Sequence, residues 1–185
     1  LSEEKVIEVL GELQRQTERI SFFAGTMKNI NRLDEIIISR AYVSQADLLA
    51  KTEAILTVLA QKYAKQFEVH SELKEQQLNL DISIFLEVLE NLIDNAMRFS
   101  VQCVRVEFRY SQSLLNVCVH DDGKGFQPDE LSKAVKPYYH GESVGTEHYG
   151  MGLYICKMLC EKHGGFLRVY NSPGGGACVE FNIAA

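Results

Sequence analysis

The sequence contains no hydrophobic run that approaches the roughly 18–20 residues needed to span a membrane as a helix. It also shows no charged segment followed by an apolar one of the kind that marks a secretory signal peptide. The net charge of −6 argues against a general nucleic-acid-binding protein, because neutralising phosphates requires a basic surface. A local basic site for a small phosphate ligand is compatible with that charge. The chain starts at Leu1 rather than Met, so we expect it to be part of a longer protein.

Cysteines are few and odd in number, which argues against a disulfide framework. Most of them lie among apolar residues, so we predict reduced, buried thiols: Cys103, Cys118, Cys156, Cys160 and Cys178. Cys156, Cys160 and His163 share one segment, but no fourth ligand lies at a suitable spacing. The sequence therefore favours packing over zinc binding there.

The 185 residues are enough for one core plus an appendage. Residues 3 to about 38 are highly charged and carry an apolar heptad: Val6, Leu13, Ile20 and Met27, with Val9, Phe23 and Ile30 in the second position and Gln16 as the exception. This pattern predicts a helix that packs in a coiled coil or antiparallel bundle. A surface helix packed on its own domain is the alternative.

The remainder alternates helix and strand signals. Ser44 and Asp47 resemble a capping box that opens a helix to about Gln66. Further helices are predicted at 82–99 and about 152–163, strands at 67–73, 77–81, 101–110, 114–121, 166–171 and 178–183, and a long loop at 126–150. Residues 111–113 and a Ser-Pro-Gly-Gly-Gly segment predict two hairpins. The fold class is α+β, a sandwich with helices on one face of a sheet.

The stretch "ENLIDNAMRFS" places a polar stripe on the helix at 82–99. At about 100° per residue one quadrant holds Glu87, Asn91, Asp94, Asn95 and Arg98, and the opposite side holds Ile82, Phe85, Leu86, Leu89, Leu92, Ile93 and Ala96. The apolar side is predicted to face the sheet. The stripe could simply face water, but asparagine is a poor helix former, so two of them one turn apart suggest a ligand.

Glycines follow in two places where backbone could approach a ligand. "HDDGKGF" ends a predicted strand at Asp121 and continues with Gly123 and Gly125, a pattern that alone indicates only a turn. "HYGMGLYICK" places Gly150 and Gly152 at the start of a helix, whose free N–H groups suit a phosphate.

Taken in order, "ENLIDNAMRFS", "DDGKGF", "KPYYHG", "HYGMGLYICKMLCEKHGG" and "GGGACVEF" resemble the ATP-binding catalytic domain of bacterial sensor histidine kinases, a branch of the GHKL superfamily. The resemblance covers about residues 44–183. The segment "QTERISFF" resembles the second helix of the preceding dimerisation domain. The resemblance implies a dimerisation helix at 1–40 and a catalytic domain at 41–185, with a lid at about 126–150 and a mixed, mostly antiparallel sheet.

The resemblance also implies ATP and Mg²⁺ as ligands. Asp121 would accept a hydrogen bond from the adenine amine, which guanine lacks, so ATP is expected over GTP. Asn91 and Asn95 would lie on the magnesium side, and Arg98 would approach the phosphates. The expected catalytic residues are Asn91, Arg98 and His140, and the expected ATP contacts are Asn91, Asn95, Arg98, Phe99, Asp121, Gly123, Gly125, Phe126, Lys136, Tyr139, His140, Gly150, Met151, Gly152, Leu153 and Ala177.

Asn91 bears on the type of reaction. Hydrolytic GHKL members carry a glutamate there as general base, and an amide cannot deprotonate water. Glu90 lies about 100° round the helix and should point elsewhere. The expectation is phosphoryl transfer to a histidine, with catalysis by positioning and charge stabilisation. The alternatives are a GHKL-type ATPase, a serine-protein kinase, or a nucleotide-binding scaffold.

Some positions depart from the family pattern. His140 replaces an arginine, His148 a glycine, and Ala177 a threonine, so the group that meets the γ-phosphate is open. Lys133 is a further lid candidate. No phosphoacceptor histidine is present, since the first histidine, His70, lies in a predicted strand and no proline occurs before Pro128.

The resemblance implies partners as well. They are the histidine of the dimerisation domain within a homodimer and a cognate response regulator, with no nucleic acid. Membrane attachment would come only through missing N-terminal segments, so this part is expected to be the cytoplasmic portion of a membrane-bound sensor.

Overall fold

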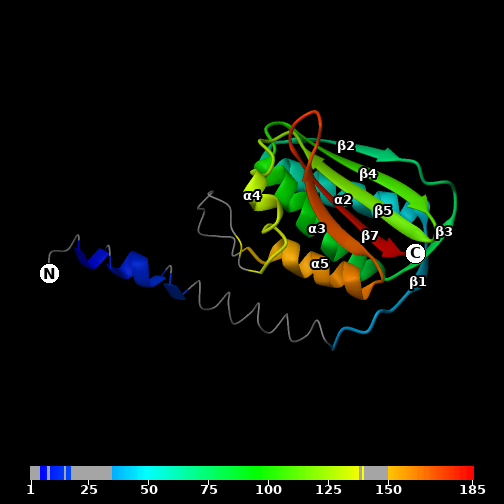
Figure 1. Ribbon diagram of the computed structural model, residues 1–185, viewed down its shortest axis with the longest axis horizontal. Coiled ribbons are helices and arrows are strands. Elements are labelled where there is room, and N and C mark those ends of the chain that lie inside the picture. The colour runs from blue at the N-terminus through cyan, green and yellow to red at the C-terminus, as the bar shows by residue number, and fades with distance from the viewer. Residues whose placement is uncertain (1–4, 8, 15, 18–34, 138, 140–149) are drawn as a thin grey trace.

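The computed structural model describes residues 5–7, 9–14, 16–17, 35–137, 139 and 150–185 (Figure 1). In chain order its named elements are β1 (Ala41–Ser44), α2 (Gln45–Tyr63), β2 (Gln66–Ser71), β3 (Gln77–Leu80), α3 (Ile82–Phe99), β4 (Cys103–Ser111), β5 (Leu114–Asp121), α4 (Pro128–Leu131), α5 (Gly152–Lys162), β6 (Phe166–Asn171) and β7 (Ala177–Ala184). No helix in these described ranges is both long and apolar enough to cross a bilayer.

The main sheet has five strands in the order β2-β4-β5-β7-β6. β2 and β4 run parallel, and the other neighbouring pairs are antiparallel. Helices α2, α3 and α5 lie on one side of this sheet (Figure 1). This confirms the predicted α+β class with a mixed, mostly antiparallel sheet.

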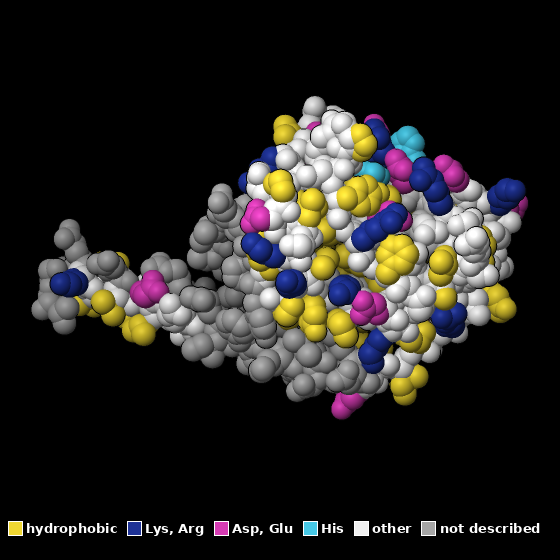
Figure 2. Space-filling view, viewed as in Figure 1, with side chains coloured by type: hydrophobic (Ala, Val, Ile, Leu, Met, Phe, Trp, Pro, Cys, Tyr) yellow, Lys and Arg dark blue, Asp and Glu magenta, His cyan; other side chains and the backbone are white. Residues whose placement is uncertain are grey.

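The strands alternate between a buried and an outward face. In β4, Val104, Val106 and Phe108 are buried under the helices, whereas Arg105 and Arg109 are exposed on the other side. This two-residue period follows from strand geometry. Figure 2 shows basic and acidic side chains interspersed over the surface in that view. The sheet therefore has one face that carries the core and one that no described helix covers.

Helix α3 runs through the core, as its periodicity predicted. Its buried residues are Ile84, Phe85, Val88, Leu89, Leu92, Ile93, Ala96 and Met97. Asp81 caps its start by accepting hydrogen bonds from the N–H groups of Ser83 and Ile84. Its bounds agree with the predicted 82–99.

Helix α2 begins as predicted and ends earlier. The Asp47 N–H donates to Ser44 Oγ at 3.1 Å, and the Ser44 hydroxyl lies 2.7 Å from Asp47 Oδ2. Ala64 adopts a left-handed conformation with φ of 52°, which stops the helix at Tyr63 rather than near Gln66.

The structure contains a short strand and a short helix that the sequence did not predict. The strand is β1, whose four residues gain their conformation by pairing with the distant β3. Within the predicted loop at 126–150, α4 forms one turn with Pro128 in its first turn and Glu130 closing a capping box on Gln127. Gln112 and Ser113, with φ of 52° and 60°, make the tight turn between β4 and β5.

The N-terminal segment is helical at residues 5–7, 9–14 and 16–17. The described apolar heptad residues are exposed there: Val6 by 41%, Val9 by 50% and Leu13 by 58%. These three side chains are not among the described residues that pack on the core, and both the helical bundle and the surface helix stay predictions. Ile20, Phe23, Met27 and Ile30 lie outside the described residues.

Residues 36–40 are not helical, contrary to the helix predicted to about residue 38. Ile36 and Ile38 pack against the core instead. The Ser39 N–H donates to Asp81 Oδ2 at 2.8 Å, and Arg40 donates to the carbonyl of His163 at 3.3 Å. These tertiary bonds hold the segment extended along the domain.

Candidate nucleotide-binding site

Two residues of the polar stripe of α3, Asn91 and Asn95, lie near the start of α5. Asn91 and Asn95 are half-buried, and a β-carbon placed on Gly152 would lie 2.5 Å from Asn91 Oδ1 and 3.6 Å from Asn95 Nδ2. A glycine at position 152 leaves room for the Asn91 amide, which any β-carbon would meet at too short a distance. The two amides therefore border the N-terminus of α5, where free backbone N–H groups favour an anion.

Asp121 lies at the end of β5, next to the start of the neighbouring strand β7. Its Oδ1 atom accepts hydrogen bonds from the N–H of Gly123 at 2.8 Å and of Ala177 at 3.2 Å. Gly176, with φ of 79°, passes so close to the Asp121 carbonyl that a β-carbon would collide with it. The carboxylate is thus fixed by one backbone donor from the turn after β5 and one from the first residue of β7.

Burial raises the pKa of the Asp121 carboxyl group, and the N–H donors of Gly123 and Ala177 act in the opposite direction. The carboxyl group of Asp121 therefore lies in a partly desolvated place. Such a carboxylate is a strong acceptor for a ligand N–H.

The turn after Asp121 approaches the end of α3. A β-carbon on Gly123 would collide with the carbonyl of Phe99. Gly125 has φ of 72°, and a β-carbon there would lie 2.7 Å from Asn171 Oδ1. These contacts bring the adenine-side residues expected from the sequence next to the end of α3, with the Phe99 ring half exposed.

Asn171 lies next to Gly125 and Phe126 of the candidate site, and the sequence did not reveal this position. Its Oδ1 atom accepts from the Phe126 N–H, and its amide donates to the Phe126 carbonyl, both at 2.8 Å. This pair of bonds fixes the backbone where the loop leaves the site. No local signal marks it, since the two residues are 45 positions apart.

Asp122 is a second residue near the candidate site that the sequence did not reveal. Its carboxylate accepts backbone hydrogen bonds from Val101, Gln102 and Cys103 at 2.7–3.1 Å. Burial alone would raise the pKa of Asp122, but these donors outweigh it and lower the pKa. Asp122 therefore binds the segment between α3 and β4 to the turn that follows Asp121.

Arg98 is held on α3 by an acidic neighbour. Its Nη2 atom lies 2.7 Å from Asp94 Oδ2, while Asp94 Oδ1 accepts from Lys62 at 2.9 Å and Tyr63 at 3.0 Å. Although burial raises the pKa of Asp94, these partners lower it overall. The Nε atom of Arg98 is buried with no hydrogen-bond partner in the described part of the chain. Asp94 thus orients Arg98, which belongs to the same polar stripe of α3 as the two asparagines.

The other expected contacts are distributed around this site. Gly150, with φ of 64°, and the buried Met151 precede α5, and Leu153 is half-buried in its first turn. Ala177 is buried beside Asp121. Among the loop residues, Lys136 is exposed and Tyr139 half-buried. His140 and His148 lie outside the described residues.

Residues 80–185 match the family described as histidine kinase-, DNA gyrase B-, and HSP90-like ATPases. The chain is 24% identical over 190 aligned positions to the sensor protein KdpD of Clostridium acetobutylicum, covering 99% of this chain and 21% of that protein. It is 27% identical over 177 positions to the sensor protein SrrB of Staphylococcus aureus, covering 86% of this chain and 30% of SrrB. The chain thus spans less than a third of the length of these relatives.

Among solved structures, full-length ShkA in complex with AMPPNP shares the fold with a TM-score of 0.75 and 21% identity, over 100% of this chain and 39% of ShkA. The match of the family over more than half of the chain agrees with the motif order and with the observed sheet. This chain belongs to the histidine kinase-, DNA gyrase B-, and HSP90-like ATPase family.

Proposed function

We propose that the chain binds ATP between α3, the end of β5 and the start of α5. The adenine meets Asp121, and the triphosphate lies at Asn91, Asn95 and the N-terminus of α5. The single observation that carries this proposal is the close approach of Asn91 Oδ1 to Gly152, which a residue with a β-carbon would block. The ShkA structure with the same fold is a complex with AMPPNP, which supports a nucleotide as ligand.

Base selection follows from the hydrogen bonds of Asp121. Two backbone N–H groups occupy Oδ1, which orients the carboxylate and leaves Oδ2 to accept from the exocyclic amine of adenine. Guanine presents an oxygen at that position and would meet the carboxylate as a second acceptor. A site of this kind discriminates by orders of magnitude, so ATP binds and GTP does not compete.

The amides of α3 fit a magnesium ion that accompanies ATP. Mg²⁺ prefers oxygen ligands and keeps several waters while it contacts phosphates. The Oδ1 atom of Asn91 lies against Gly152, and the Asn95 amide lies near the same residue. These two residues would hold the ion, which when bound neutralises phosphate charge.

The chain's own residues favour transfer over hydrolysis. Asn91 binds and orients through a neutral amide, which cannot accept a proton from water. Glu90 is exposed on a different side of α3 and does not share the half-buried stripe. Arg98, oriented by Asp94, stabilises negative charge on the phosphates, and His140 is a proposed lid contact.

The nucleophile that we infer is a histidine of a dimerisation helix outside this chain, and the final recipient is an aspartate of a response regulator. The named sensor proteins among the relatives support this assignment. The exposed apolar heptad residues near the N-terminus support a homodimeric helical bundle that presents the histidine. We further propose that the chain is the cytoplasmic portion of a membrane-bound sensor.

The test combines the chain with γ-labelled ATP, magnesium and a second polypeptide that carries a dimerisation helix with its histidine. We expect labelled phosphate on that polypeptide that is stable to base and labile to acid. A matched polypeptide with the histidine replaced by alanine is the control. Rapid release of inorganic phosphate with no labelled protein would assign the chain to the hydrolytic members instead.

A further inference from the structure

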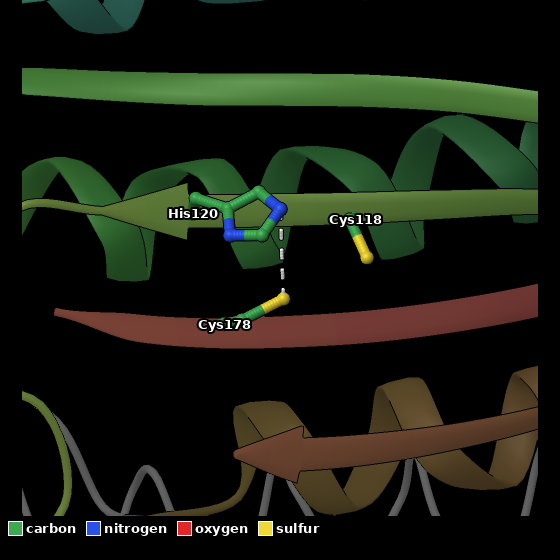
Figure 3. A group of neighbouring side chains, drawn as sticks. All are labelled: Cys118, His120 and Cys178. Atoms are coloured by element: carbon green, nitrogen blue, oxygen red, sulfur yellow. Dashed lines mark hydrogen bonds between the residues drawn. The ribbon is translucent and has the colours of Figure 1, made fainter. Parts of the chain in front are cut away.

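A cluster of soft ligands lies on the sheet face away from the helices. Cys118 and His120 project from β5 and Cys178 from β7, on the side opposite α3 (Figure 3). Their ligand atoms lie within 4.8 Å of one another. The proposed ATP site does not use any of these three side chains.

Sheet register explains why these residues meet. His120 is directly opposite Cys178, and Cys118 lies two positions before His120, so all three share one face. Cys156, Cys160 and His163, which lie close together in the sequence, are not part of this cluster. Those cysteines are buried in the core, where the Cys156 thiol lies 3.8 Å from the Val88 carbonyl.

The spacing fits a tetrahedral metal ion. Zn–S bonds of about 2.3 Å and Zn–N bonds of about 2.0 Å at tetrahedral angles separate a sulfur and a nitrogen ligand by roughly 3.5 Å. The Sγ atom of Cys178 lies 3.8 Å from Nε2 of His120. An ion between them requires shifts of only a few tenths of an ångström.

The imidazole of His120 is already oriented. Its Nδ1 atom lies 3.2 Å from the hydroxyl of Ser172, which leaves Nε2 directed toward Cys178. Histidines that bind metals characteristically use their other nitrogen in such a hydrogen bond. The orientation therefore exists before any ion binds.

A carboxylate is available for the fourth position. Glu107 is directly opposite Cys118 on β4, and its Oε1 atom lies 3.9 Å from Nε2 of His120. Glu180 on the other side is paired with Arg168 at 2.7 Å and accepts from Tyr170 at 3.2 Å. Glu107 has a longer cationic contact, 3.5 Å between its Oε2 atom and Nη2 of Arg109, and comes from the strand next to β5.

We propose that Cys118, His120 and Cys178, with Glu107 as fourth ligand, bind one zinc ion on the uncovered face of the sheet. Two thiolates and one imidazole select a borderline or soft ion and disfavour calcium and magnesium, which prefer oxygen. Zinc suits the tetrahedral arrangement with sulfur and nitrogen ligands. Binding displaces the thiol protons to solvent and involves no change of oxidation state.

The position of the ion gives it a structural role. His120 precedes Asp121 in the chain, and Cys178 follows Ala177, whose N–H donates to Asp121. A zinc ion would therefore cross-link β5 and β7 next to this hydrogen bond. Because it binds the folded state, added zinc raises the melting temperature of the chain by several degrees.

The experiment titrates the reduced, metal-free chain with Zn²⁺ against a chromophoric chelator and with Co²⁺ as a spectroscopic probe. We expect one ion per chain and a thiolate-to-cobalt charge-transfer band in the near ultraviolet. Cys118→Ser and Cys178→Ser each weaken zinc binding by at least about 100-fold, because even outer partners of a metal site contribute about 10–100-fold. Glu107→Gln and Ser172→Ala weaken it by about tenfold.

Cys103→Ser is the matched control, since Cys103 is a half-buried thiol of β4 outside the cluster, and zinc affinity stays unchanged in it. In the unaltered chain, zinc protects Cys118 and Cys178 from alkylation but not Cys103, as mass spectrometry would show without any substitution. Weak zinc binding that survives both serine substitutions would mean adventitious binding and overturn the proposal. A Cys118–Cys178 disulfide in place of stoichiometric zinc binding would overturn it as well.

Discussion

The Oδ1 atom of Asn91 lies 2.5 Å from the point where Gly152 would carry a β-carbon, so an amide of α3 fills the position next to the first residue of α5. This relationship joins two motifs that are about sixty residues apart in the sequence. It makes Gly152 a requirement of the site geometry, beyond its role in starting a helix.

Replacing Gly152 tests that relationship. Gly152→Ala should lower ATP affinity by about tenfold or more, because the methyl group displaces Asn91 from the site. Calorimetry with ATP and magnesium measures the change. Gly174→Ala is the control, since nothing lies within 4 Å of a β-carbon there. Equal affinity in both variants would mean that Asn91 does not contact the ligand.

Asp121→Asn should abolish ATP binding while the fold, followed by circular dichroism, stays intact. An asparagine can still accept the hydrogen bonds from the N–H groups of Gly123 and Ala177. It loses the negatively charged oxygen that would accept a hydrogen bond from the adenine amine. Because burial raises the pKa of Asp121, its ionised form costs stability, so the variant should melt at the same or a higher temperature near neutral pH. Unchanged ATP affinity would remove Asp121 from the site.

Asp122→Ala should destabilise the domain by about 1–3 kcal/mol, because three backbone N–H groups lose a charged acceptor. The pKa of Asp122 is lowered in the folded state, so its contribution is present above its ordinary value of 3.8 and lost as the pH falls. Urea denaturation at pH 7 and pH 3 measures both effects. A variant as stable as the parent at pH 7 would contradict this role.

We expect His163 to make the stability of the fold depend on pH in a second way. It is buried, and its Nε2 atom accepts a hydrogen bond from the Asp81 N–H at 2.9 Å, which requires a neutral ring. Burial lowers the pKa of His163 below its ordinary value of 6.5. The unfolded chain therefore takes up a proton that the folded chain resists, and stability declines as the pH falls below about 6.5.

Urea denaturation of His163→Gln at pH 8 and pH 5.5 isolates this effect, since glutamine keeps an acceptor that does not titrate. The variant should lose less stability between these pH values than the parent does. His70→Gln, at an exposed histidine, is the control and should keep the parent's pH dependence. If the two variants behave alike, another group is responsible.

Much of the fold was predictable from local patterns. The two-residue period of β4 and the apolar side of α3 determined which faces are buried, and Ser44 with Asp47 determined where α2 begins. These features depend on neighbours within one or two turns. β1 and the extended segment 36–40 were not predictable, because Asp81, His163 and β3 supply their hydrogen bonds from far along the chain.

Local sequence patterns were enough to identify the functional groups that this protein carries. They placed two amides on one side of α3, a carboxylate at the end of β5 and a glycine at the start of α5. Which of these groups come into contact depends on the three-dimensional fold, which pairs Asn91 with Gly152, Asn171 with Phe126, and His120 with Cys178. Strand register and helix packing bring such pairs together, and both depend on contacts between residues that are distant in the sequence.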